Sequence, residues 1–370
     1  MTTRTRPSLA RHDGAAATLP PITSTLRERQ LVLLRAVLAR LDGQPAGLPP
    51  WSLDEVRLTG LATGLTALAG QLGLFDGASA EVVDYIGEQR LQVRRRVARF
   101  DDVLPMVVTA LAAAAIPAVV VKGGALLHGV WDERWTRPMA DIDLIVPATH
   151  RAQAAASLTC AGFRPLHSNA FEDAFLAWGD GGVGRTDGES AEHNGRVELH
   201  PGWLEFLHGY TVRGFAPNET AFDHAALTAH VLGHLASTVV RAEVRAVNVV
   251  DVWWCARRPI DWERMAVLMS ETDPRLTAPA LWLVDQLVED AVPAAIVARE
   301  WSRLPRAARR TLASASPADV LRDPVERTSL GWRQSFARTP RERLAVVDAM
   351  AWPDGRRTVR GAARRLATRR

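Results

Sequence analysis

The sequence predicts a mixed α/β (α+β) protein in which a small sheet lies between helical N-terminal and C-terminal regions. Apolar residues recur at helical spacing before residue 101 and again after residue 216. Between these regions lie short apolar runs at residues 118–121, 141–146 and 197–200, which are typical of buried strands. The chain has 370 residues, 47% of them hydrophobic, so it is long enough for two packed modules.

We divide the chain into five parts. They are a disordered lead (1–24), a helical N-terminal region (25–100), a core (101–215), a helical C-terminal region (216–354) and a basic tail (355–370). The lead is rich in Thr, Ala, Pro and Arg without periodicity, which is typical of disorder. The tail contains seven arginines and no acid, so it could bind RNA phosphates, although such an end is more often a solvated terminus.

Three helices are expected in the N-terminal region. Apolar residues recur at helical spacing from Leu26 to Leu41, and further helices are expected at Thr59–Leu74 and Ser79–Phe100. Ser52 is a plausible N-cap for a helix that begins nearby. No catalytic constellation is evident here, so the region either packs against the core or forms one wall of a site in it.

Residues 103–121 are uncharged and long enough to span a membrane. Pro105 and Pro117 interrupt them, and an Ala-rich first part passes into a β-branched second part. This pattern favours a helix at Asp102–Ala115 followed by a strand, with no membrane association.

The strand expected at Ala118–Val121 leads into Lys122, Gly123 and Gly124, and a short helix is expected from Ala125. Glycines allow backbone N–H groups to approach an anion closely, and the N-terminus of the next helix adds partial positive charge. Lys122 is the single lysine among 45 basic residues, which indicates that a compact ammonium group is needed here. These features predict a phosphate-binding turn.

The next apolar segment carries two carboxylates, Asp141 and Asp143, on either side of Ile142. Side chains at positions i and i+2 of a strand share one face. Two carboxylates on one face of a buried strand repel each other unless a cation lies between them. Mg²⁺ fits best, with Mn²⁺ as the alternative, because it takes oxygen ligands from carboxylates and substrate phosphates together. Phosphate binding beside a metal site indicates phosphoryl or nucleotidyl transfer.

A strand, a Gly-rich turn, a short helix and an Asp-x-Asp strand together resemble the core of the DNA polymerase β-type nucleotidyltransferases. The fuller pattern is similar to uncharacterised bacterial nucleotidyltransferases of the family-five type. It comprises Lys122–Gly123, Leu126, Arg137, Asp141–Leu144, an acidic strand in Arg196–Trp203 and a His-containing helix in Leu227–Trp254. The resemblance implies a small mixed nucleotidyltransferase sheet.

The resemblance also implies roles for individual residues. Catalysis and metal binding fall to Asp141, Asp143 and Glu198, and nucleotide binding falls to Lys122, Gly123, Gly124, Arg137 and His200. In this family the third carboxylate binds metal or accepts the proton of the nucleophile, and it is usually Asp where this chain has Glu198. Glu can fill either role, with its oxygens displaced by about one bond length. By strand alternation, Glu198 and His200 share one face.

Apolar residues again recur at helical spacing in the C-terminal region. His230 and His234 are four residues apart and share a helix face, a spacing also found in zinc sites. The Val-Leu-Gly between them lacks the Glu of a zinc-protease motif, which favours packed or hydrogen-bonded histidines; the resemblance adds the alternative that one of them borders the nucleotide pocket. Arg241 and Arg245 could contact a triphosphate or form a solvated face, and Asp251 lies in an apolar setting where an acid needs a partner.

The residues and the resemblance predict a Mg²⁺-dependent enzyme that moves a nucleoside monophosphate from an NTP, with ATP as the first choice, to a hydroxyl-type acceptor. The favoured acceptor is a small molecule or a peptide in a biosynthetic pathway. The alternatives are an enzyme that modifies tRNA or protein, and a decayed enzyme that binds nucleotide without releasing pyrophosphate. A net charge of +4 does not by itself indicate a nucleic-acid binder. Cys160 and Cys255 are too few for a disulfide framework, which indicates a reducing, cytoplasmic compartment.

Overall fold

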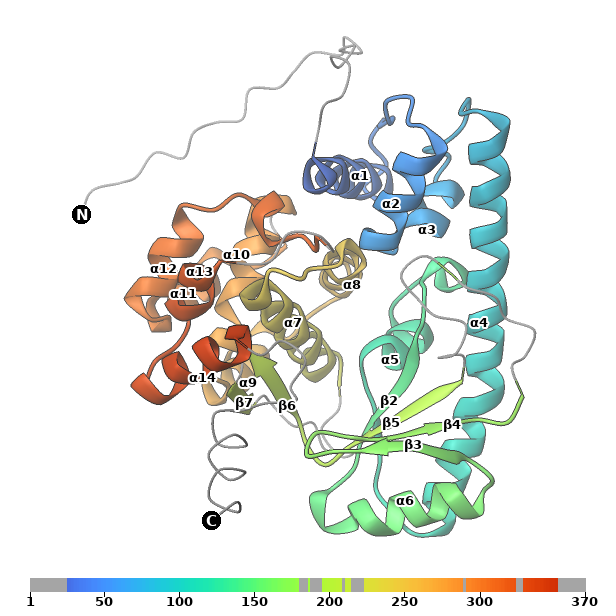
Figure 1. Ribbon diagram of the computed structural model, residues 1–370, viewed down its shortest axis with the longest axis vertical. Helices are drawn as coiled ribbons and strands as arrows, with labels where there is room; N and C mark the ends of the chain where they lie inside the picture. The colour runs from blue at the N-terminus through green and yellow to red at the C-terminus, as the bar shows by residue number, and fades with distance from the viewer. Residues whose placement is uncertain are drawn as a thin grey trace, which may run out of the picture.

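The computed structural model describes residues 25–179, 186, 195–207, 210–213, 223–288, 291–323 and 329–351. The expected lead and basic tail lie outside these residues, as do the expected boundaries near residues 215 and 354. The described part is a mixed α+β structure (Figure 1). The sheet occupies one end, helices α9 to α14 occupy the other, and α7 and α8 lie between them.

The first helices begin and end where local signals place them. Thr25 and Glu28 form a capping box at the start of α1 (Leu26–Leu41), and Ser52 forms one at the start of α2 (Leu53–Thr63). Gly64 has a left-handed φ of 69° and ends α2, so the single helix expected at residues 59–74 is instead α2 followed by α3 (Thr66–Gln71).

The long helix α4 (Ala80–Ala113) replaces the two helices that were expected on either side of residue 101. Pro105 lies inside it without ending it. Val82 packs in a cluster that the N-terminal helices share with the C-terminal helices, while Val97 and Val107 pack in the cluster under the sheet. The expected boundary between residues 100 and 101 therefore falls in the middle of a helix that joins both cores.

The main sheet has the order β1-β2-β5-β4-β3. Its strands are β1 (Val119–Val120), β2 (Asp141–Ile145), β3 (Arg164–Ser168), β4 (Asp173–Leu176) and β5 (Arg196–His200). β2 and β5 pair in parallel and the other neighbours pair antiparallel, so the sheet is mixed, as the sequence predicted.

Alternation along β2 and β5 separates a core face from a polar face. Ile142, Leu144, Val197 and Leu199 pack in one cluster with residues of α4 and of α6 (Arg151–Cys160). Because successive side chains point to opposite faces, the acids of both strands turn away from this core. The chain thus presents its carboxylates toward the helical C-terminal region.

The C-terminal region consists of α-helices packed around α7. They are α7 (His224–Arg241), α8 (Ala246–Ala256), α9 (Trp262–Glu271), α10 (Ala278–Leu287), α11 (Ala294–Arg303), α12 (Arg306–Ala313), α13 (Leu330–Ser335) and α14 (Pro340–Ala351). A hairpin of β6 (Leu204–Leu207) and β7 (Tyr210–Arg213) precedes them and was not predicted. The short 3-10 helices are η1 (Arg134–Thr136), η2 (Ala148–His150), η4 (Pro274–Leu276) and η5 (Pro317–Val320). Within the described residues, no helix has the length and apolar character needed to cross a bilayer.

Candidate active site

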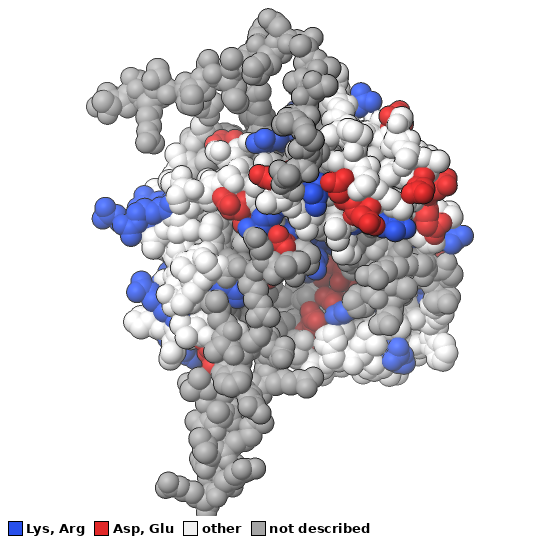
Figure 2. Space-filling model, turned by 45° about the horizontal axis from the view of Figure 1, so that its top comes forward, with Lys and Arg blue, Asp and Glu red and all other residues white. Residues whose placement is uncertain are grey.

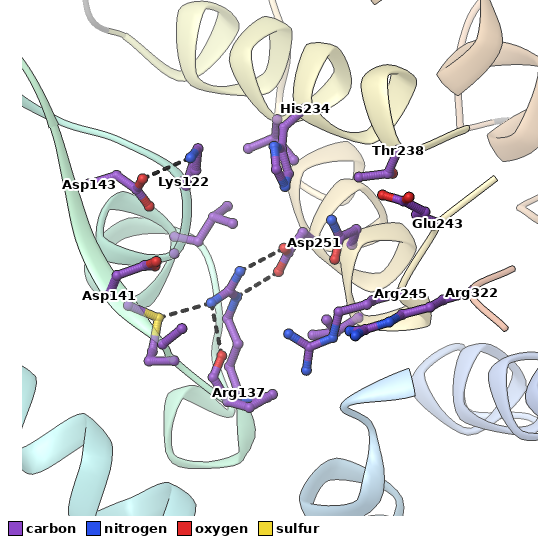
Figure 3. Close-up of a pocket in the computed structure, with 18 of the residues that line it drawn as sticks. Lys122, Arg137, Asp141, Asp143, His234, Thr238, Glu243, Arg245, Asp251 and Arg322 are labelled. Atoms are coloured by element: carbon purple, nitrogen blue, oxygen red, sulfur yellow. Dashed lines mark hydrogen bonds and ion pairs between the residues drawn. The ribbon is translucent and has the colours of Figure 1, made fainter. Parts of the chain in front are cut away.

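A cavity of about 600 Å³ opens between the sheet and the helices α7 and α8. In Figure 3, Asp141, Asp143 and Lys122 come from β2 and α5 (Lys122–Gly129) on one wall, and His234 and Thr238 come from α7 on the other. Figure 2 shows acidic side chains inside a hollow, with basic side chains beside them. The cavity volume lies within the range of small-molecule sites, about 300–1,000 Å³.

The parallel pairing of β2 and β5 brings two of the three expected metal ligands together. Asp143 lies opposite Glu198 in the register, and ligand atoms of Asp143, Glu198 and His200 all lie within 4.8 Å of one another. Asp143 is 3% exposed and Glu198 is 7% exposed. Asp141 lies two residues before Asp143 and lines the cavity, but it is not a member of this close group.

The side chains of Lys122 and His200 both contact the Asp143 carboxylate. Lys122 Nζ lies 2.7 Å and His200 Nε2 lies 2.9 Å from Asp143 Oδ1. Burial by itself raises the pKa of Asp143, but Lys122 and His200 outweigh it and hold this pKa well below its usual range. Burial and the nearby charge of Asp143 raise the pKa of Glu198. The pKa values of Asp143 and Glu198 are therefore shifted in opposite directions.

Helix α5 begins at Lys122, three residues earlier than the sequence indicated. Lys122 has a φ of 49°, a left-handed conformation that is uncommon for a residue with a side chain. The glycines lie in the first helical turn, and close packing explains their small size. A Cβ on Gly123 would lie 2.5 Å from Met139 Sδ, and one on Gly124 would lie 2.7 Å from Val120 Cγ1. The N–H groups in the first turn of α5, which have no partner within the helix, thus lie near the carboxylates.

Arg137 makes a buried ion pair with Asp251 of α8. Its Nε lies 2.7 Å from Asp251 Oδ1, its Nη2 lies 2.8 Å from Oδ2, and Trp131 Nε1 also donates to Oδ1 at 2.9 Å. The expectation that Asp251 has a partner is thereby confirmed. Arg137 lines the cavity, and this pair ties it to α8.

The two histidines of α7 have different surroundings. His230 is 1% exposed and packs against Trp203, with ring centroids 4.0 Å apart. Gly233 makes room for the same indole, because a Cβ there would lie 2.2 Å from Trp203 Cη2. His234 lines the cavity. Among the described residues, the group that could hold a metal contains His200 and neither of these histidines.

Residues 52–288 match a family model described as uncharacterised nucleotidyltransferase. The chain belongs to this family. Searches of curated proteins and of solved structures gave no match. Membership in the nucleotidyltransferase family supports transfer of a nucleoside monophosphate as the general chemistry and implies an NTP substrate.

Part of the cavity wall comes from beyond the family match. Arg322 and Asp323 line the cavity, and Figure 3 places Arg322 beside Arg245, across from Asp141. Backbone hydrogen bonds hold this segment in place, because the N–H of Arg322 donates to the carbonyl of Val244 at 2.9 Å. The sequence did not indicate these residues, since they follow a 3-10 helix and belong to no periodic pattern.

A second cavity of about 260 Å³ meets the first at Lys122, His234 and Arg241. His200 lines this smaller cavity and not the larger one, although the sequence placed it with the nucleotide-binding residues. Phe171 also lines the smaller cavity, and its carbonyl lies 3.3 Å from His200 Nδ1. The candidate site therefore has two cavities on either side of a few shared residues.

Proposed function

We propose that this nucleotidyltransferase transfers a nucleoside monophosphate from an NTP, ATP as the first choice, to a hydroxyl group in a Mg²⁺-dependent reaction. One observation carries the proposal. Asp143 and Glu198 face each other on paired parallel strands at the start of a helix whose first residue is a lysine. This arrangement supports the proposal, because carboxylates that could bind a metal beside a turn that could bind phosphate are the combination that nucleotidyl transfer requires.

The donor set fits a hard divalent cation. Two buried carboxylates lie in one small group, and Asp141 adds a third on the same face of β2, so negative charge is in excess there. Mg²⁺ takes carboxylate oxygens as ligands together with phosphate oxygens, and Mn²⁺ also accepts an imidazole such as His200. When bound by Asp141 and Asp143, with Glu198 either as a further ligand or as the base, the ion would neutralise charge that develops on the phosphates.

The larger cavity is the proposed NTP site. Its volume of about 600 Å³ suits a nucleotide, and it extends from Gly123 at the start of α5 to Arg245 and Arg322 on the opposite side. The ammonium group of Lys122 and the N–H groups at the start of α5 would bind the triphosphate. Arg137 would act indirectly, by fixing the segment before β2 against α8.

The reaction needs a base for the acceptor hydroxyl. In the proposed step the acceptor oxygen forms a bond to the α-phosphorus, the bond from that phosphorus to the bridging oxygen breaks, and pyrophosphate leaves with the electron pair. The hydroxyl proton passes to Glu198, whose raised pKa suits it to accept a proton. Asp143, with a lowered pKa, stays ionised as a metal ligand.

Release of pyrophosphate tests this function directly. We expect release from at least one of the four NTPs with Mg²⁺ and a cell extract as the source of acceptor. Asp143→Asn should reduce the rate by at least about 100-fold, since removing one electrostatic group at a reacting centre typically costs this much.

Asp54→Asn is the matched control. It makes the same chemical change far from the cavity, at a side chain that is 90% exposed. Its rate should equal that of the wild type. Release that survives Asp143→Asn would contradict the metal assignment, and nucleotide binding without release would favour the decayed enzyme.

A further inference from the structure

The smaller cavity has a size and position that the nucleotide does not explain. Its volume of about 260 Å³ falls below the usual range for drug-sized ligands, so it suits a molecule of about the size of one sugar unit rather than a whole NTP. It shares Lys122, His234 and Arg241 with the larger cavity, and its other walls are different.

The two cavities meet at the reacting centre. Asp143 lines the larger cavity, and its Oδ1 contacts His200, which lines the smaller one, at 2.9 Å. Lys122 contacts the same oxygen and borders both cavities. In nucleotidyl transfer the attacking and leaving oxygens lie roughly in line across the phosphorus. A ligand in the smaller cavity would therefore approach the phosphate from outside the NTP site.

The loop between β3 and β4 supplies a hydrogen-bond donor to this cavity. Asn169 Oδ1 accepts from the N–H groups of Phe171 and Glu172, at 2.7 and 3.1 Å. These bonds orient the side-chain amide of Asn169, which is exposed and whose N–H groups donate to no other described residue. The Asn169 amide can thus donate to a ligand oxygen.

The same loop supplies an acceptor next to apolar surface. Glu172 Oε1 is bonded to His167 Nε2 at 2.8 Å. Burial by itself raises the pKa of Glu172, but the bond from His167 and the charges of His200 and Arg196 hold it below its ordinary value, so the carboxylate is ionised at neutral pH. Phe171 adds an aromatic wall. An amide, a carboxylate and imidazoles around an aromatic ring can satisfy several hydroxyl groups while covering the apolar face of a ring.

From these contacts we infer that the smaller cavity is the acceptor subsite and binds a small neutral polyol, such as a single sugar unit. One hydroxyl of this polyol attacks the α-phosphorus and loses its proton to Glu198, as pyrophosphate leaves into the larger cavity. The inference rests on the proposed function and adds to it the chemical class of the acceptor.

Binding can be measured without turnover. Saturation-transfer NMR of the full chain without nucleotide would compare glucose, N-acetylglucosamine and myo-inositol with a serine-containing tripeptide and an RNA trinucleotide. We expect at least one polyol to bind and the other two classes not to bind. Asn169→Asp keeps the oxygen that accepts from the loop and removes the donor, so polyol affinity should fall about fivefold to tenfold.

Asn248→Asp is the matched control, because it makes the same change in the larger cavity and should leave polyol affinity unchanged. Phe171→Ala is a second variant that removes the apolar wall, and it should also weaken polyol binding. Thermal melting of each variant separates a local loss of binding from a loss of folding.

Preferential binding of the tripeptide or the trinucleotide would overturn the inference. Displacement of the polyol by ATP, or an undiminished affinity in both Asn169→Asp and Phe171→Ala, would do the same. ATP binding and pyrophosphate release in the same samples distinguish the two proposals. If only the acceptor assignment is wrong, ATP binding and pyrophosphate release are still observed. If the nucleotidyltransferase function is wrong, both are absent.

Discussion

Asp143 and Glu198 face each other across β2 and β5, and the fold shifts their pKa values apart. Burial acts on both acids in the same direction, so the difference comes from their neighbours. Lys122 and His200 contact Asp143 directly. Arg196 Nη2 also lies 2.5 Å from Glu198 Oε1, but burial and the negative charges of Asp143 and Glu172 outweigh it and raise the pKa of Glu198. Divergent pKa values in one pair of acids are typical of sites where one group stays ionised and the other moves a proton.

Substitution of Glu198 tests this division of roles. We expect Glu198→Gln to lower kcat by about 100-fold or more, because a general base contributes roughly 10²–10⁴. Glu198→Asp keeps a carboxylate and should retain activity within about tenfold of the wild type. Pyrophosphate release under saturating NTP measures both effects.

The pH dependence of the same reaction follows from the raised pKa of Glu198. The ionised form accepts the proton, so the rate should fall as the pH drops through a value above the ordinary Glu pKa of about 4.3. Glu198→Gln should abolish this limb of the profile. An unchanged profile in that variant would assign the proton to another group.

At the scale of elements, helix α5 shows how packing restricts the residue types that a helix can hold. Its first turn lies so close to its neighbours that side chains at residues 123 and 124 have no room. Gly129 at the other end of α5 has no neighbouring atom within 4 Å of the position that a Cβ would take. The two ends of one helix therefore differ in their tolerance of a methyl group.

We predict that Gly124→Ala destabilises the protein by about 1–3 kcal/mol, the usual cost of overpacking. The added Cβ would lie 2.7 Å from Val120 Cγ1 and 2.9 Å from Phe100 Cζ. Gly129→Ala is the control in the same helix and should be neutral or stabilising by up to about 1 kcal/mol. Chemical unfolding measures the stability of both variants. Equal changes in the free energy of unfolding would show that helix propensity, rather than packing, determines the effect of each substitution.

At the scale of the whole molecule, buried ion pairs connect segments that are distant in the chain. Asp273 caps η4 and accepts from Arg275, which is 4% exposed and also contacts Glu342 of α14 at 3.0 Å. Burial by itself raises the pKa of Asp273, but Arg275 and Arg338 hold it below its ordinary value. The last described helix is thus attached to the C-terminal core through a charged network.

Asp273→Asn should lower the free energy of unfolding at pH 7 by about 1.5–3 kcal/mol, the usual contribution of hydrogen bonds to a charged group. Because the folded pKa of Asp273 lies below the unfolded one, its contribution is present above the ordinary value of 3.8 and is lost as the pH falls through the folded pKa. Urea unfolding at pH 7 and near pH 3 should therefore show a difference from wild type that shrinks in acid. Asp54→Asn, at an exposed position, should show no difference at either pH.

Much of the site was predictable because its spacing is local. Asp141 and Asp143 are two residues apart in a strand, as are Glu198 and His200, so alternation alone places each pair on one face. The boundaries that failed depended on distant contacts. The helices expected at Ser79–Phe100 and Asp102–Ala115 are one helix that packs against two clusters, and the start of α5 depends on atoms of Phe100, Arg137 and Met139.

The sequence by itself determined the fold class, the family and the shared face of Asp141 and Asp143, because these depend on periodicity and on residues close together in the chain. The tertiary structure decided how those residues are partnered. It paired Asp143 with Lys122 and His200, and Arg137 with Asp251 of α8. It also divided the site into two cavities, because distances between separate elements depend on how their side chains pack and leave no periodic pattern in the sequence.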